Sequence, residues 1–263
     1  MGLFTTPARR PWFRGEVVAE IVDPRARALG VAGRVSVVIL TVATVGTSAL
    51  VAHRQIRESR KSGCAEQLRG LGRAMLAYQE AEGHFPAPSI RDSGGTPLLS
   101  WRVALLPKLG YQKLYEKFRL DEPWDSPHNL ALIAEMPAEF ACPGGPGRRT
   151  GRTGYFVIVG PESGPTSVNT VFEPTRGVDL REITDGTSGT LLMIESDRSV
   201  PWTSPEDQRW SPDGPLPMPS SPHRGGANAL FADGSLHFLK ATIGEQILRA
   251  LLTINAGDVI GGG

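Results

Sequence analysis

An uninterrupted stretch of eighteen uncharged residues, from Val35 to Ala52 (VSVVILTVATVGTSALVA), limits what this chain can fold into more than any other feature. Eighteen helical residues are just enough to cross the hydrocarbon core of a bilayer. A buried core helix is one alternative, but such helices are usually apolar on one face, and this segment is apolar all round. A cleavable signal peptide is another, although the 34 residues before the segment are long for a signal. We therefore predict a retained transmembrane helix at 35–52, preceded by a flexible basic leader at 1–34.

Charge is distributed unevenly along the chain. The formal net charge is only +1, yet residues 1–73 carry 12 Lys and Arg against 5 Asp and Glu. These basic residues flank the apolar segment and lack the interleaved aromatic residues on which bases stack, so we expect a membrane as a partner and no nucleic acid. Three Lys or Arg lie within about twenty residues before the segment and five lie within about twenty after it, which favours a cytoplasmic C-terminal side.

Residues 53–88 have the pattern of an amphipathic helical stem. Their apolar side chains recur at steps of three, four or eight residues, which places them on one face of a helix. Gly83, Pro86 and Pro88 then end the helix. We call this face the apolar stripe; it consists of Ile56, Cys64, Leu68, Leu71, Met75 and Tyr78.

Short helices are expected in the domain that follows, at 89–256. Ser100 is a suitable N-cap for a helix beginning at Trp101, and Ser126 followed by Pro127 is a typical helix start. Near the end of the domain, residues 242–245 (TIGE) match a capping box and predict a final amphipathic helix. A glycine-rich tail at 257–263 completes the chain.

Strands alternate with these helices. The apolar runs at 155–159 and 190–194 are bounded by turn residues, as expected of buried strands. Residues 197–222 contain seven prolines and predict a long ordered loop, for which Trp202 and Trp210 supply anchors. The predicted fold class is therefore α+β.

A β-hairpin is the clearest local signal. Asp233-Gly234 lies between two apolar runs and predicts a two-residue turn in which both central residues have positive φ. This register pairs Phe231 with Leu236 and places one set of side chains on a common buried face. The set consists of Ala229, Phe231, Leu236 and Phe238.

Several separated motifs resemble the DUF1559 family, proteins with an H-X9-DG signature that are numerous in planctomycetes. The motifs are RQIRESRKSGCAEQLRGLGRAMLAYQEAEGHFPAP from Arg54, residues 101–143 with DEPWDSPHN, ITDGTSGTLLMIE, VPWTSPED and HRGGANALFADGSLHFL. Nine residues separate His223 from Asp233-Gly234, as the signature requires. The resemblance covers about residues 54–250.

The resemblance implies a pseudopilin-like architecture related to type II secretion. A long N-terminal helix, partly in the membrane, would be followed by a domain built on an antiparallel sheet with short helices. It also implies that this domain lies outside the cytoplasm, against the charge count. Family members commonly carry a glutamate near the start of the apolar run, and residues 35–52 contain none. We therefore expect an anchored, exported domain of the cell envelope in preference to a processed filament subunit.

The motif residues His223, Asp233, Gly234, Asp185 and Gly186 allow two interpretations. In the first, His223 and Asp233 approach each other across the base of the hairpin, and carboxylates add oxygens for a calcium-like cation, which prefers oxygen ligands. In the second, which we favour, His223 bonds a loop backbone and the aspartates shape their own turns, so that no cofactor is required. The candidate cation ligands are Asp185, Glu195 and Asp233, with Asp197 as a further oxygen donor.

Cys64 and Cys142 also lie within the matched motifs. Two cysteines are too few for a disulfide scaffold or a thiolate zinc site, which needs three or four ligands. In an exported domain they form either one disulfide, which ties the stem to the sheet domain, or two buried free thiols.

Two classes of function follow. In the first, the protein is a structural or assembly component whose apolar stripe packs against partner helices or a second copy. In the second, an anchored domain binds a ligand or a carbohydrate through the proline-rich loop with Trp202 and Trp210. An enzyme is least favoured and no catalytic residues are predicted, because neither Ser188 nor Ser221 lies in a G-x-S-x-G motif.

Overall fold

The computed structural model describes the backbone of residues 24–145, 150–161 and 169–257, and the chain forms two compact units, residues 1–53 and 54–263. Helix α1 (Pro24–Glu82) begins in the first unit and ends in the second, so the last part of the predicted leader is helical. Residues 1–23 and the side chains of residues 24–47 lie outside the described set. Within the part that the structure describes, no helix is long and apolar enough to cross a membrane. The transmembrane segment at 35–52 stays a prediction.

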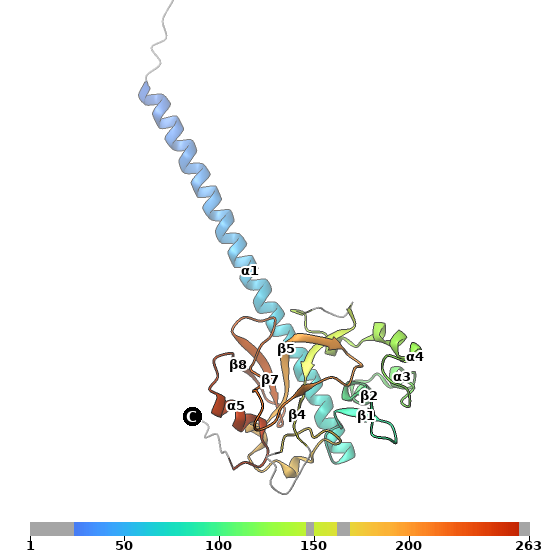
Figure 1. Ribbon diagram of the computed structural model, residues 1–263. Coiled ribbons are helices and arrows are strands. Elements are labelled where there is room, and N and C mark those ends of the chain that lie inside the picture. Colours follow the sequence, from blue (N-terminus) through green and yellow to red (C-terminus); the bar gives the residue numbers. More distant parts are fainter. Residues whose placement is uncertain (1–23, 146–149, 162–168, 258–263) are drawn as a thin grey trace, which may run out of the picture. The chain divides into compact units, whose positions relative to one another are not determined.

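An antiparallel sheet forms the centre of the second unit (Figure 1). Its strand order is β3-β5-β7-β8, and each neighbouring pair is antiparallel. These strands are β3 (Arg152–Phe156), β5 (Leu191–Pro201), β7 (Gly226–Phe231) and β8 (Leu236–Lys240). Two small sheets accompany it: β1 (Ser89–Arg91) pairs with β2 (Pro97–Ser100), and β4 (Ile158–Val159) pairs with β6 (Gln208–Arg209). The α+β prediction with an antiparallel sheet is confirmed.

Short helices connect the strands, and local chemistry sets where they begin. The Oγ of Ser100 accepts a hydrogen bond from the N–H of Arg102, and that of Ser126 accepts one from Asn129, which confirms both predicted caps. The capping box at 242–245 is wrong: the last helix begins at Glu245 with Gly244 as its N-cap and no side-chain bond. The helices after α1 are α2 (Trp101–Ala104), η1 (Leu106–Leu109), α3 (Gln112–Tyr115), α4 (Pro127–Ala131), η2 (Leu132–Glu135), η3 (Ala138–Phe140), η5 (Leu180–Glu182), η6 (Thr187–Gly189) and α5 (Glu245–Leu252).

The apolar stripe of α1 forms part of this chain's own core. From Cys64 to Met75 its side chains are fully buried in one cluster with sheet residues such as Leu230. A Cβ on Gly72 would lie 2.8 Å from Leu230 Cδ1, so a glycine at this point lets the helix approach the sheet. Only Ile56, at the start of the stripe, remains strongly exposed, at 48%. The prediction that the whole stripe packs against partner helices is therefore wrong.

The proline-rich segment also differs from its prediction. Strand β5 continues to Pro201, so residues 197–201 are not loop. Trp202 and Trp210 do anchor the segment, and both are buried, Trp202 completely. The Trp202 ring stacks on Phe140 with centroids 5.6 Å apart, and its Nε1 donates to the carbonyl of Ile133. Buried rings cannot form the carbohydrate-binding surface that the sequence suggested.

The predicted hairpin exists, but its register is shifted by one residue. Leu230 pairs with Leu236 and Ala229 with His237. Gly234 has a φ of +84°, whereas no described residue other than glycine has a positive φ, so Asp233 does not fit the two-residue turn. Because of this shift, Ala229 shares a face with His237 and not with Phe238. Since β7 is buried along its whole length, both of its faces contact core residues.

A buried ion pair joins the segment after β5 to the rest of the domain. Arg102 Nη2 lies 3.0 Å from Asp207 Oδ1, and both side chains are at most 1% exposed. Asp207 also accepts hydrogen bonds from Trp101 Nε1 and from the backbone N–H of Val157. The same guanidinium donates to the carbonyl of Tyr155. These bonds pair the two charges inside the core and leave only Arg102 Nε of the guanidinium without a hydrogen-bond partner among the described residues.

Candidate functional site

Four side chains with ligand or redox chemistry meet in the interior of the second unit. Cys64 comes from α1, Cys142 from the segment after η3, Glu195 from β5 and His223 from the loop before β7. Their ligand atoms all lie within 4.8 Å of one another, and all four side chains are buried. No other such group of three or more occurs among the described residues. We call it the Cys-His-Glu cluster.

Cys64 and Cys142 form a disulfide with their Cα atoms 4.8 Å apart, across 78 residues of sequence. The bond ties α1 to the segment that follows η3. A Cβ on Gly63 would lie 3.2 Å from Pro143 Cγ, so the glycine lets the two segments approach closely enough to be bridged. The structure therefore favours the disulfide over two free thiols.

Glu195 is held by β7. Its side chain is 1% exposed, and Oε2 accepts hydrogen bonds from the backbone N–H of Asn228 at 3.0 Å and from Asn228 Nδ2 at 2.9 Å. These bonds leave Oε1 without a hydrogen-bond partner among the described residues, 3.8 Å from His223 Nε2. Burial raises the pKa of Glu195 to about 7, while the Asn228 bonds and the charge of Lys61 oppose that rise.

His223 lies between Glu195 and the disulfide. Its Nε2 is 3.7 Å from Cys142 Sγ. The backbone N–H of His223 donates to Ser221 Oγ at 3.1 Å, and that hydroxyl donates to the carbonyl of Gly226, which fixes the loop. A Cβ on Gly144 would lie 2.8 Å from His223 Cε1. Burial, followed by the charge of Lys61, lowers the pKa of His223.

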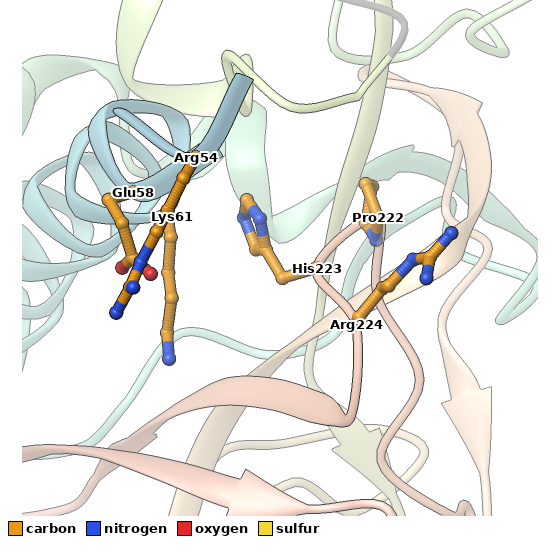
Figure 2. Close-up of a pocket in the computed structure, with 6 residues that line it drawn as sticks. All are labelled: Arg54, Glu58, Lys61, Pro222, His223 and Arg224. Carbon is orange, nitrogen blue, oxygen red and sulfur yellow. The ribbon is translucent and has the colours of Figure 1, made fainter. Parts of the chain in front are cut away.

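A solvent-open pocket of about 420 Å³ reaches the cluster through His223. Figure 2 shows its walls, with one group of side chains on α1 and another on the loop before β7. Three cations and one carboxylate line it, so its potential is positive. The lining residues are Arg54, Glu58, Lys61, Pro222, His223 and Arg224.

The remaining motif residues have structural roles. Asp185 accepts hydrogen bonds from two backbone N–H groups near the end of the described chain, at 2.8 and 2.9 Å. Asp233 Oδ1 accepts from the N–H of Ser235 at 2.8 Å. The glycines that follow these aspartates, Gly186 and Gly234, both adopt positive φ. The prediction that each aspartate shapes its own turn therefore holds for Asp233, whereas the Asp185 carboxylate binds the backbone of Ala256 and Gly257.

The predicted cation ligands are not brought together. Asp185 and Asp233 do not belong to the Cys-His-Glu cluster, and Asp197 instead accepts a hydrogen bond from Ser220. The calcium set is therefore wrong, and of its members only Glu195 lies in a group of ligating side chains. His223 contacts Glu195 and Cys142, not the loop backbone that the sequence suggested for its ring. Sequence reasoning missed this grouping, although all four residues lie in the motifs quoted above.

Comparison with protein families identifies the chain. A family model described as a protein of unknown function, DUF1559, matches residues 54–217. The chain belongs to the DUF1559 family. The match ends before His223, so the last of the DUF1559 motifs lies outside the matched residues. No curated protein and no solved structure matches the chain.

Proposed function

We propose that this DUF1559 protein is a membrane-anchored, pseudopilin-like and non-enzymatic structural or assembly protein of the cell envelope, with its C-terminal domain outside the cytoplasm. The Cys64–Cys142 disulfide is the observation that carries the proposal. Disulfides form and persist in oxidising compartments, whereas cytoplasmic thiols are kept reduced. A buried bond that ties α1 to the rest of the domain therefore favours export.

The surface of α1 supports an anchor close to the domain. Leu50 and Val51, at the end of the predicted transmembrane segment, are 70% and 56% exposed. Apolar side chains in water are unfavourable, so lipid or a second protein is the better environment for them. Because the apolar stripe from Cys64 to Met75 is buried in its own domain, a partner helix cannot contact that part of the stripe, and Ile56 is the strongly exposed residue of it.

The helix-on-sheet core supports the pseudopilin-like part of the proposal. The second part of α1 packs on an antiparallel sheet, as the family resemblance leads us to expect. Ser221, one of the two serines considered as a nucleophile, directs its hydroxyl to the carbonyl of Gly226 and accepts from the backbone N–H of His223. That bonding favours a structural role for the serine.

Topology is the direct test. We would place single reporter cysteines in the full-length chain at Thr5→Cys, before the predicted transmembrane segment, and at Ser93→Cys, in the exposed turn between β1 and β2. Intact cells of a bacterial host with a periplasm would be treated with a membrane-impermeant maleimide. We expect labelling at position 93 in intact cells and at position 5 only after permeabilisation. The opposite pattern, or a native Cys64–Cys142 pair that is reduced in cells, would overturn the proposal.

A further inference from the structure

The spacing in the Cys-His-Glu cluster is that of metal ligands. Zinc forms bonds of about 2.3 Å to sulfur and about 2.0–2.2 Å to nitrogen or oxygen, so ligand atoms of a tetrahedral site lie roughly 3.3–3.8 Å apart. His223 Nε2 is 3.7 Å from Cys142 Sγ and 3.8 Å from Glu195 Oε1. The distance from nitrogen to oxygen is too long for a hydrogen bond between them. Both separations are close to those between two ligands of one metal ion.

One buried oxygen points to such a cation independently. Glu195 Oε1 has no hydrogen-bond partner within the described part of the chain, although its side chain is 99% buried. Leaving a carboxylate oxygen unsatisfied in the interior is costly. Asn228 fixes the other oxygen, so Oε1 is held toward His223. A metal ion bound there would satisfy it.

We propose that, once the Cys64–Cys142 disulfide is reduced, Cys64, Cys142, His223 and Glu195 bind one zinc ion in a tetrahedral site. Two thiolates, one imidazole and one carboxylate form a donor set that suits zinc and disfavours calcium or magnesium, which take oxygen ligands. Two cysteines alone are too few for a thiolate zinc site, and here His223 and Glu195 complete the four ligands.

The surroundings fit a charged zinc centre. Two thiolates and one carboxylate around Zn²⁺ leave one net negative charge, and Lys61 is close enough to act electrostatically on both Glu195 and His223. The backbone N–H of Gly144 donates to Cys142 Sγ at 3.4 Å, a bond that becomes stronger when the sulfur is a thiolate. Outer partners of this kind hold ligands in place and tune a metal site.

Reduction and metal binding follow one another as balanced steps. A dithiol reductant transfers two electrons and two protons to the disulfide, which yields two thiols, and is itself oxidised to a disulfide. Zn²⁺ then displaces the two thiol protons as both Zn–S bonds form. The solvent-open pocket brings solvent to His223, the one residue of the cluster that lines it. The disulfide and the zinc site are therefore mutually exclusive states of one centre.

The test uses the purified full-length protein in a mild detergent. Protein reduced with a phosphine and then desalted without oxygen is titrated with Co²⁺, a spectroscopic substitute for zinc, and with Zn²⁺. We expect one equivalent to bind, with a thiolate-to-cobalt charge-transfer band and the visible bands of tetrahedral cobalt. Oxidised protein should give neither. His223→Ala and Glu195→Gln should each lower the affinity by about 100-fold or more, since the loss of an outer partner alone costs about 10–100-fold.

Matched controls and a second readout keep the result decisive. His237→Ala and Glu206→Gln change an exposed histidine and an exposed glutamate outside the cluster and should leave the affinity unchanged.

Zinc should raise the melting temperature of the reduced protein and not that of the oxidised protein, even if the reduced protein is largely unfolded without metal. A reduced protein that neither binds cobalt through thiolate nor gains stability with zinc overturns the proposal. So does binding that is insensitive to both His223→Ala and Glu195→Gln. The experiment does not depend on topology, so its failure and that of the proposed function are distinguishable.

Discussion

Reducing the Cys64–Cys142 disulfide should destabilise the domain by an amount that follows from its position in the chain. The bond closes a loop of 78 residues. The chain-entropy relation for a cross-link of that length gives about 4.5 kcal/mol of stability at 25 °C. Reduction leaves every heavy atom of both buried side chains in the protein, so it opens no large cavity. The loss of the cross-link is therefore the main contribution.

The assay is urea unfolding of the full-length protein in nonionic detergent, followed by tryptophan fluorescence. Trp101 and Trp202 are completely buried and report on the core. A chelator is present throughout, so that no metal replaces the cross-link. With a denaturant slope of about 2–3 kcal/mol/M, reduction should lower the midpoint by roughly 1.5–2.3 M.

A double variant provides the control. Cys64→Ser with Cys142→Ser lacks the bond in either condition, so the reductant should leave its midpoint unchanged. If mass spectrometry shows complete reduction of the native protein and its midpoint falls by less than about 0.5 M, the cross-link does not constrain the unfolded chain as argued, and its proposed structural role fails.

Two further predictions concern the core around the site, both measured by the same urea assay. Asp207→Asn leaves the Arg102 guanidinium buried without its counter-ion and should cost about 3–5 kcal/mol. Glu206→Gln breaks only an exposed pair and should change stability by less than about 1 kcal/mol; equal effects would show that burial does not matter there. Gly177→Ala places a Cβ against the backbone carbonyl of Phe85 and should cost about 1–3 kcal/mol. Gly189→Ala has open space around it and should stay within about 0.5 kcal/mol, so a neutral Gly177→Ala would contradict the packing argument.

Features decided by local chemistry could be predicted from the sequence. Ser100 and Ser126 cap helices because a short hydroxyl side chain can reach the free N–H groups of the first turn. The apolar stripe follows from the helical repeat alone, and most of it is buried. What covers it could not be predicted, because periodicity identifies an apolar face and not its partner. Here the partner is the sheet of the same chain.

The register of the hairpin was predicted wrongly for a similar reason. Alternation of polar and apolar residues fixes a register only when one face of a strand is exposed to solvent. Strand β7 is buried along its whole length. Both of its faces are therefore equally enclosed, and the pattern of polar and apolar residues does not distinguish the two registers. The backbone conformation sets the register instead, because Gly234 adopts a positive φ and Asp233 does not, and the loop is longer than two residues.

The Cys-His-Glu cluster was the feature hardest to predict from the sequence, although each of its four residues was already a candidate site residue. Cys64 and Cys142 were expected to form either a disulfide or two free thiols, Glu195 was placed in a cation site with the wrong partners, and His223 was expected to contact a loop backbone. The contact between Cys142 and His223 spans 81 residues, and that between Asn228 and Glu195 spans 33. The number of residues between two such positions does not indicate whether their side chains meet in the fold. The residues meet because glycines at 63 and 144 let two loop segments approach α1 and His223. The same closeness that allows the disulfide also sets the ligand spacing, so one arrangement of four residues supports two chemical states.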